Sequence, residues 1–320
     1  MADGKWIPGL TPGMSVPDAA RVVLAARLEV VRHHLPLAAE RPFEDPEHVH
    51  QLRVGTRRAG AALRVFADWL PNKHRKATRN YLRAIRRAAG DARDWDVFLL
   101  GLPVAKPLRT PAGKPALDFL FGYGFGERCA AQARLVQAAA DAGPGFTEEA
   151  LALPDRTREA DGDAPDTFGE LAASHLGGLL AAFTDAVRAD PTAPADLHRL
   201  RILGKRLRYA TELFADCFSP PLKDALYPAV ESLQETLGEL QDAAVGAERL
   251  ETLRVRVEQV SPAEWPRLRR GVTGLIRSVK AKLPAGRTKF RAWRAGWEKL
   301  TTQYPLESLR LPPAATPVTA

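Results

Sequence analysis

A histidine and three arginines recur at helical spacing in the first part of the chain. His50, Arg53, Arg57 and Arg64 fall within about 60° of one another when each residue is turned by about 100° around a helix axis. Guanidinium groups stay charged near neutral pH and can grip two oxygens of one anion, and an imidazole can donate a hydrogen bond beside them. Neighbours on such a face lie roughly 5–6 Å apart, which suits a chain of phosphates better than one small anion.

The same phrase occurs a second time. The segment "VHQLRVGTRRAGAALRVFA" begins at residue 49 and "LHRLRILGKRLRYATELFA" begins at residue 197, an offset of 148 residues. That offset carries His50 onto His198 and Arg53 onto Arg201, and further on it carries Asp94 onto Asp242 without a gap. One register kept over about fifty positions indicates two copies of one helical unit.

Both copies pair an apolar stripe with a basic stripe. In the second copy His198, Arg201, Lys205 and Arg208 share the basic side, and Glu212 is the single acid that joins it. Like charges at these spacings destabilise a helix by about a few tenths of a kcal/mol per pair. We therefore expect a polyanion to lie across the two rows.

The next segment, residues 73–87, is rich in lysine and arginine and contains no acid, whereas its counterpart in the second copy has lost most of its positive charge. The first copy is thus expected to carry more of the binding. Asp94 and Asp242 are interpreted as structural partners of basic side chains, and the two histidines serve equally well as helix-start hydrogen-bond donors or as ligand contacts. The candidate binding residues are His50, Arg53, Arg57, Arg58, Arg64, Arg75, Arg79, Arg83, Arg86, His198, Arg201, Lys205, Arg206 and Arg208.

Long helical segments must position these residues, because strand-like alternation is scarce. Breakers separate segments predicted at 17–40, 47–70, 73–102, 115–141, 167–189, 195–217, 221–255, 264–283 and 286–302. The expected fold is all-α, with two antiparallel four-helix-type bundles related by a pseudo-twofold axis. Repeat one covers 15–141, a mobile linker 142–166 and repeat two 167–302, with disordered ends at 1–14 and 303–320.

Composition restricts the function classes. The 320 residues carry 46 Lys and Arg against 38 Asp and Glu, a formal net charge of +8, which favours anionic partners. Two distant cysteines argue against a disulfide framework and a cysteine zinc site. No signal-peptide core and no apolar stretch near eighteen residues is seen, so a soluble, cytoplasmic protein with no membrane span is expected.

The doubled phrase, together with "ARDWDVFL" and "LGELQDAAV", resembles the two halves of a CHAD domain, the conserved-histidine α-helical domain, over residues 15–302. The resemblance implies the two-bundle all-α fold, binding of inorganic polyphosphate along a basic surface, and association with polyphosphate granules. It places the family signature on His50, Arg53, Arg57, Arg58, His198, Arg201, Lys205, Arg206 and Arg208. A triphosphatase domain precedes many relatives, but the chain lacks its Glu-x-Glu-x-Lys segment.

Two other function classes were weighed. A nucleic-acid-binding helical protein is the main alternative, although no helix-turn-helix or zinc-finger signature appears and few aromatics interleave with the basic rows. An enzyme is less favoured, because dinucleotide, P-loop and His-Glu-x-x-His motifs are absent. We therefore expect a non-catalytic protein with no catalytic residue, metal or cofactor, whose oligomeric state is left open.

Overall fold

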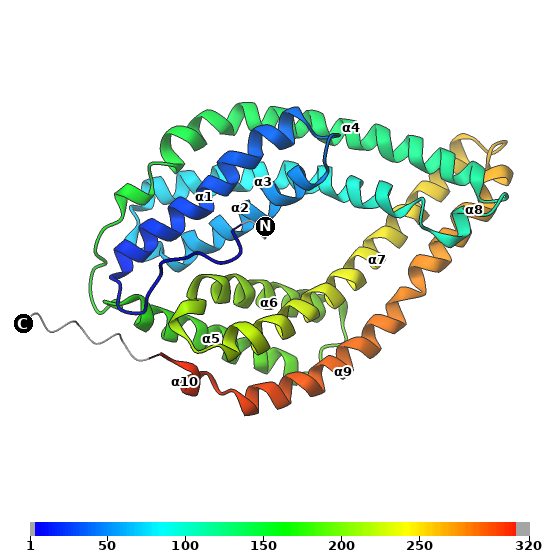
Figure 1. The fold of residues 1–320 in the computed structure, drawn as a ribbon. Coiled ribbons are helices and arrows are strands. Elements are labelled where there is room, and N and C mark those ends of the chain that lie inside the picture. Colours follow the sequence, from blue (N-terminus) through cyan, green and yellow to red (C-terminus); the bar gives the residue numbers. More distant parts are fainter. Residues whose placement is uncertain (1–3, 312–320) are drawn as a thin grey trace, which may run out of the picture.

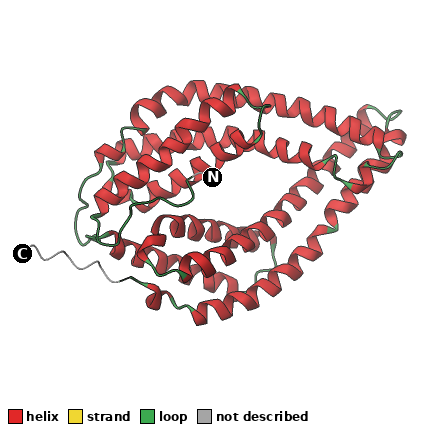
Figure 2. Ribbon diagram, viewed as in Figure 1, coloured by secondary structure: helices red, strands yellow, loops and turns green. Residues whose placement is uncertain are grey.

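The computed structural model describes residues 4–311, and in that range every regular element is a helix (Figure 1; Figure 2). The expected all-α class is therefore confirmed, and pairing of the strand type in this range is limited to the isolated bridges Ser15–Thr167 and Phe218–Arg310. The α-helices are α1 (Val16–Glu40), α2 (Glu47–Val65), α3 (Asn72–Gly101), α4 (Lys114–Gly145), α5 (Phe168–Arg188), α6 (Pro194–Phe214), α7 (Tyr227–Val260), α8 (Trp265–Lys280), α9 (Lys282–Gln303) and α10 (Leu306–Leu309).

The helices form two bundles. Helices α1 to α4 make the first, in which each helix packs on the next one along the chain (Figure 1). Helices α5, α6, α7 and α9 make the second, and α8 packs against both α7 and α4 at the far end of the molecule. The bundles also meet along α2 and α6, and the starts of α1 and α5 are joined through the Ser15–Thr167 bridge.

Helix bounds follow the offset found in the sequence. Adding 148 to the bounds of α2 gives 195–213, which differs by one residue at each end from α6. Adding 148 to the bounds of α4 gives 262–293, a range that in the second half is divided between α8 and α9. The two halves thus share their helix order, with one long helix of the first replaced by two. The pseudo-twofold relation of the bundles stays a prediction.

One apolar core runs through both bundles. Phe168 of α5 stacks with Phe66 and packs on Phe214, with ring centroids 6.3 Å and 5.1 Å apart, so the equivalent aromatics of the two halves meet on one ring. All three rings are fully buried. A second, smaller core lies at the far end, where Leu120 of α4 packs with Leu268 and Val272 of α8. These contacts make the two bundles one packed unit.

The chain ends differ from the sequence expectation. Residues 1–14 were expected to be disordered, yet Ile7 and Leu10 are buried in the main core. The expected tail 303–320 begins with helix α10, whose Leu306 and Leu309 are also buried, while residues 312–320 lie outside the described range. Both end segments contain isolated apolar residues between prolines, a pattern that is typical of disordered tails. In the fold these apolar residues pack against the core.

The segment 142–166 is likewise packed. It continues α4 to Gly145, passes through a single π-turn at Phe146–Ala150, and buries Phe146 and Leu153 in the core. The backbone N–H of Arg158 donates to the carbonyl oxygen of Trp69, which fixes the segment across the first bundle. The polar residues at 155–166 favoured a linker in the sequence, although Phe146 and Leu153 just before them are buried. No helix in the described range is long and apolar enough to cross a membrane.

Candidate functional site

The basic faces of the two halves lie against each other along α2 and α6. Arg53 and Arg57 come from α2, Arg201 and Lys205 come from α6, and all four side chains are half-buried. We call these four residues the central basic cluster. Burial lowers the pKa of Arg53, and the charges of Arg57 and Arg201 lower it further. The two rows therefore form one surface, a relation that the sequence alone left open.

Lys205 has the most perturbed environment of the cluster. Burial, and then the positive charges of Arg57, Arg201 and Arg53, lower the pKa of its amine from 10.5 to about 7. No carboxylate of residues 4–311 forms an ion pair with it, and the charges that shift it are all positive. An amine surrounded in this way gains most from an anion that enters the site.

A second group of cations continues the surface on the side of α3. It comprises Arg64 of α2, Arg86 of α3 and Arg206 of α6, which we call the flanking cluster. Burial lowers the pKa of Arg64, and Arg206 and Arg86 lower it further. Arg86 also couples to Arg57 and to Arg83, so α3 links the flanking cluster to the central one. None of the three forms an ion pair with a carboxylate of the described residues.

Two aspartates lie at the edge of the central basic cluster. Asp94 Oδ1 is 3.5 Å from a terminal nitrogen of Arg53. Burial lowers the pKa of Arg201, and the charge of Asp242 partly offsets that lowering. Both carboxylates are exposed, and they occupy equivalent positions in the two halves. Asp94 is thus placed to orient a guanidinium group without covering the site. For Asp242 the structural role stays a prediction.

The two histidines are not equivalent. His50 is half-buried beside Arg53 and Arg57, and burial, followed by the charge of Arg93, lowers its pKa below 6.5. His198 is exposed and, with Arg201 and Gln241, lines a cavity of about 160 Å³ between α6, α7 and α9. The lowered pKa favours the neutral imidazole of His50, which can donate a hydrogen bond to an anion.

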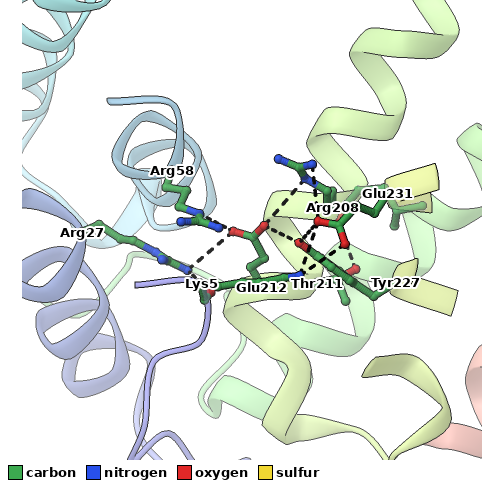
Figure 3. Close-up of polar contacts among 9 residues, drawn as sticks. Lys5, Arg27, Arg58, Arg208, Thr211, Glu212, Tyr227 and Glu231 are labelled. Atoms are coloured by element: carbon green, nitrogen blue, oxygen red, sulfur yellow. Dashed lines mark hydrogen bonds and ion pairs between the residues drawn. The ribbon is translucent and has the colours of Figure 1, made fainter. Parts of the chain in front are cut away.

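Arg58 and Arg208 are held by a buried carboxylate below the surface (Figure 3). The Glu212 side chain is fully buried, accepts a 2.7 Å hydrogen bond from Arg58 Nε, and lies 3.7 Å from Arg208 Nε. Tyr227 of α7 donates to its other oxygen at 2.7 Å, and Arg27 of α1 approaches to 4.0 Å. These contacts give both arginines a structural partner. Arg58 of α2 joins the two halves through Glu212, whereas Arg208 pairs with Glu212 within its own helix.

Further candidates lie towards the start of α3. Arg75 donates to Asn72 Oδ1 at 2.6 Å, and Arg79 is exposed on the next turn. Neither is among the main charges that shift the pKa values of the central basic cluster. Residues 267–294 form a further basic segment near the C-terminus. Its charge is partly neutralised, since Lys280 pairs with Glu251 and Arg294 with Asp190.

Sequence reasoning missed Tyr209. Its ring is 5% exposed, the Arg208 guanidinium lies 5.2 Å from its centroid, and its hydroxyl couples to arginines of α2, α3 and α6. A phenol among guanidinium groups adds a neutral donor to the floor of the site. On the helical wheel of α6 it lies on the basic side, beside His198 and Lys205, so the helical spacing could have found it. No group of three or more His, Cys, Asp or Glu side chains suited to a metal ion occurs among the described residues.

Comparison with known proteins agrees with this architecture. The crystal structure of the CHAD domain from the plant Ricinus communis matches with a TM-score of 0.71 at 26% identity, covering 91% of this chain and 95% of that one. PptA from Streptomyces chartreusis matches with a TM-score of 0.68 at 19% identity, covering 88% and 99%. No curated protein sequence matches the chain significantly. The sequence model of the CHAD domain matches residues 22–251, and the chain therefore belongs to the CHAD domain family.

Proposed function

We propose that the chain is a non-catalytic binding module for inorganic polyphosphate, which lies along the central basic cluster and the flanking cluster. One observation carries this proposal: seven cations from α2, α3 and α6 share one surface, and most of them have no carboxylate partner in the described residues. Such a surface is electrostatically unfavourable when empty. A linear polyanion with closely spaced charges relieves the repulsion along its whole length.

The length of the polyphosphate should affect affinity more than the charge on any one phosphate group. Side chains on one helix face recur about every 5–6 Å, so a short phosphate spans only a few of the cations. Long polyphosphate bridges α2 and α6 and reaches Arg86 on α3, and each contact that it makes releases counterions. The protein accordingly supplies a surface for capture of the polymer, and association with polyphosphate granules follows from the same binding.

The decisive experiment measures binding of fluorescent long-chain polyphosphate at several salt concentrations. For the unmodified chain we expect tight binding at low salt with a steep salt dependence, and weak competition by tripolyphosphate. Replacing Arg57 and Arg201 together by Gln should lower the slope of log affinity against log salt by about 0.7 per arginine. The matched control is Arg254→Gln with Arg267→Gln, because these arginines pair with carboxylates on α7 and before α8.

Three outcomes would overturn the proposal as stated. In one, the control pair weakens binding as much as the central pair does. In the other, single-stranded DNA or RNA of equal charge displaces long polyphosphate, which would assign the surface to nucleic acid instead. Phosphate release from polyphosphate that depends on His50 or His198 would replace the non-catalytic role by an enzymatic one.

A further inference from the structure

Lys205 combines three properties within the central basic cluster. It lies one helical turn from Arg201 and one turn from Arg208 on α6, and it faces Arg53 and Arg57 of α2 across the contact between the halves. It is only half-buried, so small molecules can reach it. It is also the one amine among guanidinium groups, and an amine can form a covalent bond to a carbonyl carbon at neutral pH where a guanidinium does not.

The charges around Lys205 make it both a nucleophile and part of an anion site. The positive charges of Arg201 and Arg208 act on it from α6, and those of Arg53 and Arg57 act on it from α2. Of the nearby acids, Asp94 pairs with Arg53 and Glu212 with Arg208, and the charge of Asp242 acts on Arg201. Because its pKa is about 7, a large share of the amine is uncharged at neutral pH. An ordinary lysine with a pKa near 10.4 is uncharged in only about one part in a thousand or less.

We propose that Lys205 is a modification site for acyl phosphates, whose phosphate group is held by Arg53, Arg57 and Arg201 while the amine attacks the acyl carbon. The proposal rests on the proposed function only in using the same arginines to hold phosphate. The ligand class follows from the chemistry of the site: a phosphate for the guanidinium groups and an electrophilic carbon beside it for the amine.

The reaction balances without a further co-reactant. A phosphate held beside Lys205 favours the protonated amine, so Nζ first passes its proton to that phosphate. The lone pair of the uncharged Nζ then forms a bond to the carbonyl carbon, and the bond from that carbon to the bridging oxygen breaks. Inorganic phosphate leaves with that electron pair and takes up the proton that the nitrogen loses. The arginines stabilise the leaving phosphate, as cations do in acyl and phosphoryl transfer generally. The product amide carries no charge, so the central basic cluster loses one cation.

Acylation would therefore regulate the surface. An acylated Lys205 can no longer be protonated when a polyphosphate arrives, and its acyl group occupies space between α2 and α6. The affinity for polyphosphate should fall, and the salt slope should decrease by about 0.7 because one charge is lost. A cell rich in acyl phosphates would by this route release the polymer.

The test incubates the full chain with acetyl phosphate and follows acetylation of each lysine by peptide mass spectrometry. We expect Lys205 to react at least about tenfold faster than Lys282 and Lys299, which are exposed. Acetic anhydride, which has no phosphate, is the matched reagent, and it should show a smaller preference for Lys205. The variant Arg57→Gln should reduce the preference seen with acetyl phosphate, and Lys205→Arg should remove the fast site.

The outcomes separate this proposal from the proposed function. If acetyl phosphate labels Lys205 no faster than Lys282, the modification site is overturned, whatever the polyphosphate titration gives. If acetic anhydride shows the same preference as acetyl phosphate, the arginines do not hold the reagent and the proposal is also overturned. Fast labelling that excess polyphosphate does not slow supports the modification site and contradicts the proposed function, whereas protection by polyphosphate supports both.

Discussion

Arg58 of α2 donates a 2.7 Å hydrogen bond from Nε to the fully buried carboxylate of Glu212 on α6, across 154 positions of sequence. The same carboxylate accepts from Tyr227 of α7 and is approached by Arg27 of α1 (Figure 3). One acid thus ties four helices of both bundles together directly beneath the basic surface. The distance between the basic rows of α2 and α6 depends on this contact.

The first prediction concerns removal of that acid. The variant Glu212→Ala should lower the free energy of unfolding by about 3–5 kcal/mol, because it leaves Arg27 buried without its counter-charge and removes the 2.7 Å contact of Arg58. Urea unfolding followed by circular dichroism measures the change. The control Glu239→Ala breaks an exposed contact with Lys289 and should cost less than about 1 kcal/mol. Equal losses in the two variants would show that Glu212 is not the joint between the halves.

The basic rows could be predicted from the sequence, but their meeting could not. Helical periodicity places Arg53 and Arg57 on one face from local spacing alone, and the offset of 148 residues predicts a second face at Arg201 and Lys205. Whether two faces converge depends on how helices far apart in sequence pack, and periodicity carries no such information. The shift in the pKa of Lys205 appears only when α2 lies against α6.

Glu212 shows why some site residues were misread. On the helical wheel it joins the basic stripe of the second half, so it suggested relief of repulsion at the surface. In the fold the C-terminal end of this stripe faces the interior, and the Glu212 side chain is fully buried there. It forms ion pairs with Arg58 and Arg208. A carboxylate is buried at this depth only when cations accompany it, which explains why two arginines of the signature point away from solvent.

The second prediction concerns the flanking cluster without ligand. Arg206 lowers the pKa of Arg64, and no carboxylate in the described range neutralises either. The variant Arg206→Gln should therefore raise stability slightly, by about a few tenths of a kcal/mol, while it weakens polyphosphate binding. Differential scanning calorimetry with and without polyphosphate measures both effects. The control Arg267→Gln loses a 3.3 Å contact with Glu264 and should show neither the gain in stability nor the loss of affinity.

The third prediction compares the contributions of His50 and Arg57 to the salt dependence of polyphosphate binding. Burial, followed by the charge of Arg93, lowers the pKa of His50, so its imidazole is charged less readily than a guanidinium group. His50→Gln should reduce affinity modestly and lower the salt slope less than Arg57→Gln, which should lower it by about 0.7. Titrations at four salt concentrations distinguish the two variants. A slope that falls equally in both would mean that His50 binds as a cation.

The last prediction is a pH dependence set by Lys205. Its pKa in the empty site is about 7, and a bound phosphate raises it, because a nearby negative charge favours the protonated amine. Below about pH 7 the amine is already charged, so this group makes affinity independent of pH there. Above that value each binding event must take up a proton, and affinity should fall by up to about tenfold per pH unit until the pKa of the complex is reached. Lys205→Arg keeps the charge at all these pH values and should flatten the profile between about pH 7 and 9. Calorimetry in two buffers of different ionisation enthalpy gives the proton uptake directly. An unchanged pH profile in Lys205→Arg would show that another group is responsible.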